Sequence, residues 1–426
     1  MIQAGFGQKN ITPELGAEMP GGINKNLAKH VHDELLANAM VLDDGESQLV
    51  LAGIDALSVK SSVVRKAREG IEAATGISAG NVLIAASHTH NGGPIADVFM
   101  SESDPAYCDF VAEQLVGAAV EGYERREAVN LIIGAGEEGS VAFNRRFRMK
   151  DGSERTHPGK CNPDIAHVAE PTDPMVGVIG AVNESCELLG CWVNYTCHAT
   201  LGVGSGGFSA DYIYYLRQIV QRAMGTDDAI VVFGNGALGD VTQVDNLRNR
   251  GQESGEHWGW HVGTTVGAEV VKVLARMEYT NDVVLSAASE TIDLPLRALD
   301  DEVLNQTQAW GSQPVWDREL ELLREIKKVE PQVPAEIQMM QIGTAGLVSV
   351  PAEYFCRFGL DIKASSPFDL TFVVALANGC VGYVPTPQAF IGGGYEPRTA
   401  RSSKLCPDAG DRIAAIAIRL LNQAGV

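Results

Sequence analysis

The sequence has few of the features that membrane-bound or nucleic-acid-binding proteins need. Only 6% of its 426 residues are aromatic, and no apolar run approaches the roughly 18 residues that span a bilayer. Lys and Arg number 33 against 54 Asp and Glu, and the resulting net charge of −21 repels polynucleotides and anionic lipid surfaces. We therefore expect a small-molecule partner, no nucleic acid and no stable membrane insertion.

Closely spaced cysteine pairs are also absent, and we expect no signal peptide. The eight cysteines are scattered and form no C-x-x-C pair, so we expect reduced packing residues rather than a zinc-binding set. The first six residues contain neither a basic n-region nor an apolar core. We therefore expect a cytoplasmic protein, and its association into a homo-oligomer is left open.

Apolar runs rich in Val and Ile alternate with longer segments of helical apolar spacing, which is typical of an α/β protein. We expect strands at 48–54, 82–86, 229–233 and 370–375, and helices at 60–74, 104–125, 210–224, 258–277, 352–364 and 409–424. The polar, Gly- and Pro-rich segment 135–173 is interpreted as a long functional loop.

The charged segment 294–336 is expected to be largely helical, since it carries an apolar stripe at helical spacing, formed by Trp316, Leu320, Leu323 and Ile326. The chain has no internal repeat and no low-complexity tract that would mark a boundary. A single catalytic domain over residues 1–426 is therefore the default expectation.

Several chemically active side chains directly follow predicted strands. Ser87-His88-Thr89-His90 follows the strand at 82–86, at the sheet edge where α/β proteins bind ligands. In an extended backbone, histidines at i and i+2 point the same way, so one can bind a metal while the other moves a proton. Taken alone, the pair fits structural histidines equally well.

Four further segments share this placement. They contain His198 after an apolar strand, a glycine-rich turn from Gly234 to Gly239, Glu353 after Pro351, and Tyr383 after the strand at 370–375. Each alone has an ordinary structural explanation, such as a buried histidine or a carboxylate near a helix N-terminus. Together the strand ends can converge on one rim, where two histidines and one carboxylate form a familiar zinc ligand set.

The order and spacing of these segments resemble those of the neutral ceramidases, zinc amidases that hydrolyse an N-acyl bond. The resemblance extends over roughly residues 4–400. It implies a fold of layered mixed β-sheets flanked by helices. It also implies Zn²⁺ as cofactor, with the ligands His88, His198, Glu353 and Tyr383.

The same resemblance implies the catalytic residues. His90 would move the proton, Tyr395 of the Tyr395-Glu396 pair would contact the reacting carbonyl, and Arg145 of the Asn144-Arg145 pair would bind the substrate oxygen. A serine sometimes assigned as nucleophile falls on Thr242, within Gly-Asp-Val-Thr-Gln-Val, and this replacement favours metal-activated water over a covalent route. Because the sequence ends soon after these motifs, we expect no counterpart of the family's immunoglobulin-like C-terminal domain.

The sequence thus predicts a zinc-dependent hydrolase that cleaves an amide by metal-activated water. Ceramide itself is disfavoured by the acidic composition and by the scarcity of aromatic residues. Arginines 145, 146, 148, 398 and 401 suit a small anionic substrate, although exposed surface charge explains them equally well. A lactonase or esterase acting on a small anionic or sugar-derived substrate, and a non-catalytic small-molecule-binding protein, are the alternatives.

Overall fold

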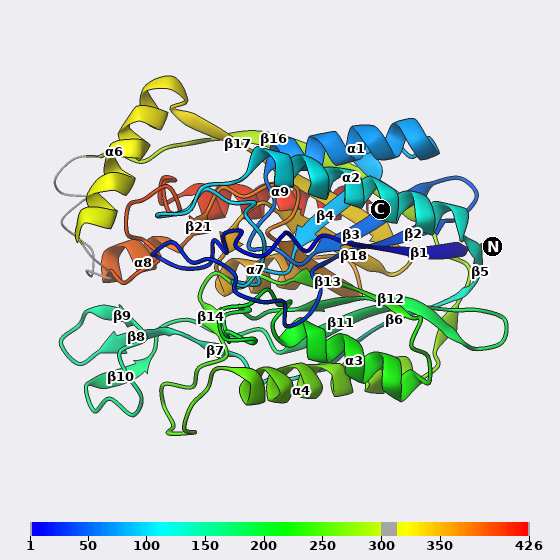
Figure 1. Cartoon of the computed structure of the whole chain (residues 1–426), viewed down its shortest axis with the longest axis horizontal. Helices are drawn as coiled ribbons and strands as arrows, with labels where there is room; N and C mark the ends of the chain where they lie inside the picture. Colours follow the sequence, from blue (N-terminus) through cyan, green and yellow to red (C-terminus); the bar gives the residue numbers. More distant parts are fainter. Residues whose placement is uncertain (1, 300–312, 425–426) are drawn as a thin grey trace.

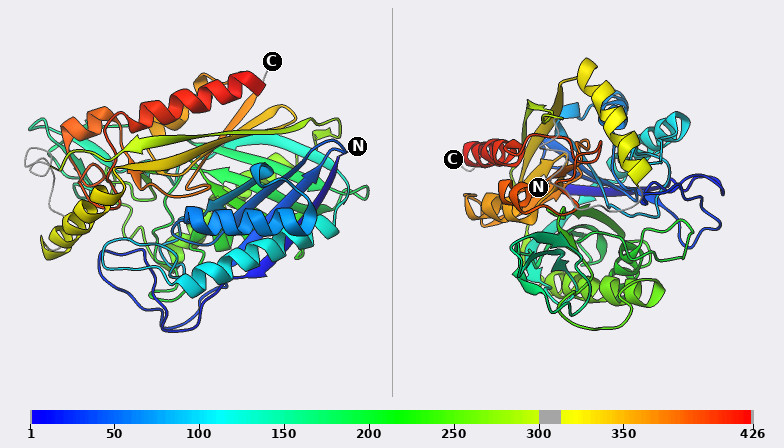
Figure 2. Two further views of the ribbon diagram at one scale, coloured as in Figure 1. Left: turned by 90° about the horizontal axis from the view of Figure 1, so that it is seen from above. Right: turned by 90° about the vertical axis from the view of Figure 1, so that its left-hand side faces the viewer.

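The computed structural model describes residues 2–299 and 313–424, which form three mixed β-sheets with helices on their outer faces (Figures 1 and 2). In each sheet antiparallel strands end in one parallel pair. The predicted layered arrangement of mixed sheets and flanking helices is confirmed.

The first sheet is built by the N-terminal part of the chain. Its strand order is β4-β3-β2-β1-β5, and helices α1 and α2 cover it. The elements are β1 (Gln3–Asn10), β2 (Leu36–Asp43), β3 (Gln48–Ile54), α1 (Ser61–Thr75), the short helix η1 (Ala79–Asn81), β4 (Val82–Ala86), α2 (Pro105–Glu124) and β5 (Glu127–Ala128).

The second sheet has the order β13-β12-β11-β6-β15 and packs against α3 and α4. Its elements are β6 (Asn130–Glu137), β11 (Met175–Val182), β12 (Leu188–Tyr195), α3 (Tyr212–Met224), β13 (Ile230–Asn235), α4 (Glu256–Leu274) and β15 (Tyr279–Thr280).

The third sheet has the order β16-β17-β18-β20 and is covered by α7 and α9. Helices α6 and α8 belong to the same part of the chain. The elements are β16 (Leu285–Pro295), α6 (Gln313–Val329), β17 (Gln332–Ile342), β18 (Ala345–Val350), α7 (Cys356–Ala364), β20 (Leu370–Ala375), α8 (Pro387–Gly392) and α9 (Ala409–Ala424).

The inner faces of the three sheets pack on one another. Strand β3 illustrates why its sequence is continuously apolar: Leu49 and Leu51 face the core between the sheets, whereas Val50 and Ala52 face the core under the helices. Because successive strand residues point to opposite faces, a strand that is buried on both sides needs apolar residues throughout. Each sheet contributes an aromatic side chain to this inner core: Phe6 from the first, Trp192 from the second and Phe372 from the third.

Several predicted elements are confirmed and three predictions are wrong in part. Strands 48–54, 82–86 and 370–375 have the predicted bounds. Segment 135–173 is not simply a loop. It contains the last residues of β6 and four short strands, β7 (Phe143–Asn144), β8 (Arg146–Met149), β9 (Glu154–Thr156) and β10 (Ile165–Val168). Strands β8, β9 and β10 form a small sheet although their sequence is polar, whereas β7 pairs with Val241 and Thr242.

The other corrections concern helix bounds. The helix expected at 352–364 begins only at Cys356, because Glu353 lies in β19 (Glu353–Tyr354), which pairs with β21 (Tyr383–Val384). Only 313–329 is helical in 294–336, since β16 and β17 occupy its ends and 300–312 lies outside the described residues. The predicted stripe of α6 is correct, with Trp316 and Leu323 fully buried.

No helix in the described part of the chain is both long and apolar enough to cross a bilayer. The single-domain organisation stays a prediction.

Candidate metal centre

The predicted site residues lie beyond the carboxyl ends of the three parallel strand pairs. These pairs end in register at Ile54 and Ala86, at Tyr195 and Asn235, and at Val350 and Ala375. Hydrogen bonds join the strand ends of different sheets: Asn235 Nδ2 donates to Ser87 O at 3.0 Å, and Ala86 N donates to Leu376 O at 3.1 Å. Segments far apart in sequence are thereby fixed around one point.

His88 and His198 are both buried, and each is oriented by the backbone. Nδ1 of His88 lies 2.7 Å from Leu57 O, and Nδ1 of His198 lies 2.9 Å from both Leu238 O and Val241 O. A carbonyl can only accept, so each Nδ1 carries the proton and Nε2 of a neutral ring presents a lone pair. Burial above all, then Arg145 and His88, holds the pKa of His198 well below its ordinary value, so that ring is neutral.

Glu353 completes a group of three. Its Oε2 lies 3.4 Å from Nε2 of His88 and 3.4 Å from Nε2 of His198. This buried oxygen accepts no hydrogen bond within the described residues. The three potential ligand atoms lie within 4.8 Å of one another. Three electron-pair donors thus face a common centre, an arrangement that a cation would stabilise.

The backbone at His88 differs from the expected extended form. His88 has φ 67°, in the left-handed region. The extended-strand argument for the His88-His90 pair is therefore wrong, because the chain turns sharply between β4 and His90. The rings still meet, with the two Nε2 atoms 3.4 Å apart.

His90 is held by the N-terminal part of the chain. Its Nδ1 donates to Gly21 O at 2.5 Å, and a Cβ on Gly21 would lie 2.3 Å from His90 Cβ, so only glycine permits this approach. Burial, and then His88, lowers the pKa of His90 to about 3. His90 is outside the three-residue group described above, in keeping with its predicted separate role.

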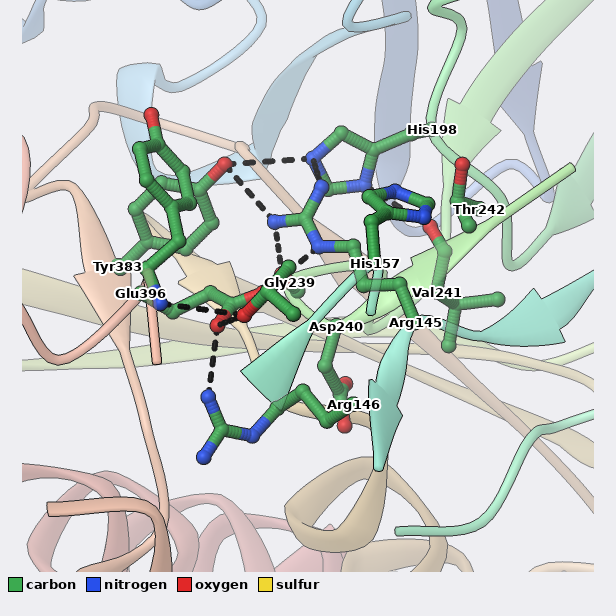
Figure 3. Close-up of polar contacts among 12 residues, drawn as sticks. Arg145, Arg146, His157, His198, Gly239, Asp240, Val241, Thr242, Tyr383 and Glu396 are labelled. Carbon is green, nitrogen blue, oxygen red and sulfur yellow. Dashed lines mark hydrogen bonds and ion pairs between the residues drawn. The ribbon is translucent and has the colours of Figure 1, made fainter. Parts of the chain in front are cut away.

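Arg145 connects Tyr383 to the histidines (Figure 3). Its guanidinium donates to Tyr383 Oη at 3.1 Å, to Gly239 O at 2.8 Å and to His198 Nε2 at 3.2 Å. The Tyr383 hydroxyl itself lies 3.4 Å from His198 Nε2. Burial, and then the charge of Glu353, raises the pKa of Tyr383 well above its ordinary value. Tyr383 therefore reaches the edge of the three-residue group.

Beneath Arg145 lies a buried ion network. Glu396 is fully buried and accepts from Arg145 Nε at 2.7 Å, from Arg146 Nη1 at 2.7 Å and from Thr156 Oγ1 at 2.7 Å. Burial alone would raise the pKa of Glu396, but Arg145 and Arg146 lower it to about 2. Glu396 is consequently ionised and fixes the position of the Arg145 side chain.

The remaining predicted residues differ in how they are placed. Tyr395 packs edge-on against Tyr383, with ring centroids 5.7 Å apart. Thr242 is buried and its hydroxyl donates to Gln243 Oε1 at 3.1 Å, on the far side of His198 from Tyr383 in Figure 3. Asn144 uses its amide for Asp240 Oδ2 and Pro171 O, at 2.7 and 2.9 Å. The Asn144 side chain is therefore engaged in hydrogen bonds within the protein.

The predicted arginine cluster is satisfied largely by the protein's own carboxylates. Arg146 binds Glu396 and Glu154, and Arg148 binds Glu154. Arg401 forms an ion pair of 2.6 Å with Glu319. Sequence reasoning did not predict these ion pairs, because the arginines and their carboxylate partners come together only in the folded structure. Sequence reasoning also missed Gly21 as the partner of His90, because the Gly21-Gly22 pair looks like any other glycine pair in the sequence.

The geometry can be compared with that of known proteins. No protein-family model matches the chain, and no curated protein sequence matches it either. Among solved structures, neutral ceramidase from Pseudomonas aeruginosa superposes with a TM-score of 0.76 at 19% identity, covering 100% of this chain and 74% of that one. This chain has the neutral ceramidase fold.

A second structure, a ceramidase complexed with C2, gives the same result with a TM-score of 0.76, 19% identity, 99% of this chain and 74% of that chain. At this identity the likeness shows the fold, and the chemistry must be argued from the residues.

Proposed function

We propose that this protein is a zinc-dependent hydrolase that cleaves an acyl carbon–nitrogen bond by metal-activated water. The proposal rests above all on one observation: Nε2 of His88, Nε2 of His198 and Oε2 of Glu353 face one another within 4.8 Å. The amide as target comes from the resemblance to neutral ceramidases, and the shared fold supports it.

The donor set fits zinc. Two imidazoles and a carboxylate that leave one position open are typical ligands of catalytic zinc sites. Backbone carbonyls hold both Nδ1 atoms, as zinc-binding histidines require. The lone Oε2 of Glu353 would gain a partner, and Tyr383 would be a fourth protein ligand beside the position that a water molecule takes. Zinc bound there would supply Lewis acidity, which polarises a water molecule and an acyl carbonyl.

Arg145 would stabilise the negative charge that develops on the acyl oxygen. In the structure its Nη1 donates to His198 Nε2. When that nitrogen serves as a ligand, the same N–H is released and can donate to the substrate. Glu396 holds the guanidinium in place, so the donor needs no reorganisation during the reaction. Tyr395, next to Tyr383, would provide a second donor.

His90 would move the proton. Its Nδ1 is bound to Gly21 O, so the ring can accept and return a proton only at Nε2, which faces the centre. Thr242 has no part in this scheme, because its hydroxyl is bonded to Gln243.

Hydrolysis of a panel of N-acyl amino acids, simple amides and sugar lactones by the purified protein tests this function. We expect amide cleavage that a chelator abolishes and added zinc restores. Glu353→Gln should lower kcat/KM by more than about 100-fold, whereas Glu325→Gln, on the exposed face of α6, should not change it. Amide cleavage that survives chelation would overturn the proposal, and cleavage of lactones alone would favour the lactonase alternative.

A further inference from the structure

A small cavity adjoins the three-residue metal group. Glu353 lies in its wall together with Gly382 and Ser402, and its volume is about 150 Å³. A cavity of roughly this volume holds one benzene ring. It therefore has room for a compact substituent.

Three cations line this cavity, and two of them are neutralised by carboxylates. Lys60 forms an ion pair of 2.5 Å with Asp97, which lines the same cavity. Arg401 forms its ion pair with Glu319. These two side chains add little net charge to the cavity.

Lys404 is different. Its Nζ donates to the backbone carbonyls of Val381 and Arg401, at 2.7 and 2.9 Å. No carboxylate of the described chain lies within the 4.0 Å of an ion pair. Burial lowers the pKa of Lys404, in accord with a charge that is poorly compensated. An ammonium has three donors, so one remains for a ligand.

The backbone fixes Lys404 relative to Glu353. Tyr383 N donates to Ser402 O at 2.7 Å, and Glu353 N donates to Gly382 O at 2.9 Å. The segment that carries Lys404 therefore packs on β21, which in turn pairs with β19, where Glu353 lies. An anion bound to Lys404 would therefore lie in the cavity that Glu353 also lines, at a position fixed by the backbone.

We infer that the substrate carries a carboxylate close to its scissile amide, as in a small N-acyl amino acid, and that Lys404 binds this carboxylate in the cavity beside Glu353. This inference rests on the proposed hydrolase function and deepens it. Lys404 is then a specificity-determining residue, whereas Arg401, which is paired with Glu319, is structural. Charge-assisted hydrogen bonds of this kind change affinity by about 10- to 100-fold.

Binding of a pair of non-hydrolysable ligands tests the inference independently of turnover. The pair is N-(methylsulfonyl)glycine and its uncharged primary amide, which differ only in the carboxylate. By titration calorimetry, the wild-type protein should bind the anion about 10- to 100-fold more tightly than the amide. Lys404→Met should reduce that ratio to about one without weakening the amide, and Lys404→Arg should restore part of it.

Lys328→Met, which removes an exposed lysine of α6, is the matched control and should keep the full preference. Equal or absent binding of the two ligands by the wild type, or a preference that survives Lys404→Met, would overturn the inference. Preference without any amide turnover would instead retain the carboxylate site and contradict the hydrolase function. Metal-dependent amide turnover at equal rates with and without a carboxylate on the substrate would retain the hydrolase function and contradict the carboxylate site.

Discussion

The side chain of Glu396 accepts hydrogen bonds from two arginines and a threonine. It is completely buried, and its two oxygens bind Arg145, Arg146 and Thr156. A buried carboxylate is costly unless its neighbours compensate the charge, and here two guanidiniums do so. At the residue scale, the position of Arg145 near Tyr383 and His198 therefore depends on an ion network outside the metal group.

Replacing Glu396 with Gln should destabilise the protein by about 3 kcal/mol at pH 7, since Arg145 and Arg146 lose a buried partner. The pKa of Glu396 is lowered to about 2, against roughly 4.3 for an unfolded glutamate. Its contribution is therefore present above that unfolded value and is lost as the pH falls towards the folded pKa.

Urea unfolding from pH 7 down to the lowest pH at which the wild type folds measures this contribution. The gap between wild type and Glu396→Gln should narrow below about pH 5. Glu325→Gln, at an exposed ion pair, should show almost no gap. A gap of equal size at every pH would refute the assigned ionisation.

The sequence allowed only part of the site to be predicted at this scale. His88, His198 and Glu353 could be found because each follows a strand that is visible as an apolar run. The partners Glu396 and Gly21 could not be found in this way, because they meet Arg145 and His90 only through the tertiary structure. Lys404 likewise looks like any surface lysine until its two carbonyl partners are known.

Among the elements, the short pair β19 and β21 matters most for the site, because it carries Glu353 and Tyr383. Gly382 precedes β21 with φ 91°, and a Cβ there would lie 2.4 Å from Ser402 O. Any larger residue would push the segment that carries Ser402 and Lys404 away from β21. Such two-residue strands have no periodicity, and for that reason the sequence predicted a helix start at 352.

Gly382→Ala should therefore lower the free energy of unfolding by more than the unfavourable backbone conformation of alanine alone explains. Gly16 has a similar φ of 89° and open space around it, so Gly16→Ala isolates the conformational cost of about 1 kcal/mol. We expect Gly382→Ala to lower the free energy of unfolding by about 2–4 kcal/mol. Equal losses in chemical denaturation of the two variants would show that the contact with Ser402 is unimportant.

The long, doubly buried strands were the predictable elements. Strands such as β3 and β4 must be apolar throughout, and this leaves a clear pattern in the sequence. The strands β7 to β10 are short and carry polar and charged residues such as Arg146 and Glu154, whose burial depends on ion pairs. Hydrophobic patterning cannot detect burial of that kind.

Across the whole molecule, each of the three sheets contributes a parallel pair whose ends meet at the candidate metal centre. His88 follows the parallel pair of the first sheet, His198 follows a strand of the pair in the second, and Glu353 follows a strand of the pair in the third. A metal that binds all three would link the three sheets, and it would stabilise the folded state by an amount that grows with the logarithm of its affinity. The central claim is thus that the fold brings these three ligands together to hold one zinc ion.

Zinc content, measured by elemental analysis of the purified protein, tests this claim most directly. The account predicts close to one zinc per wild-type chain and about as much in His257→Ala, which removes an exposed histidine of α4. His88→Ala should lose the zinc while keeping the wild-type far-ultraviolet circular dichroism. Full zinc occupancy in His88→Ala, or none in the wild-type protein after growth and purification with zinc, would contradict the account.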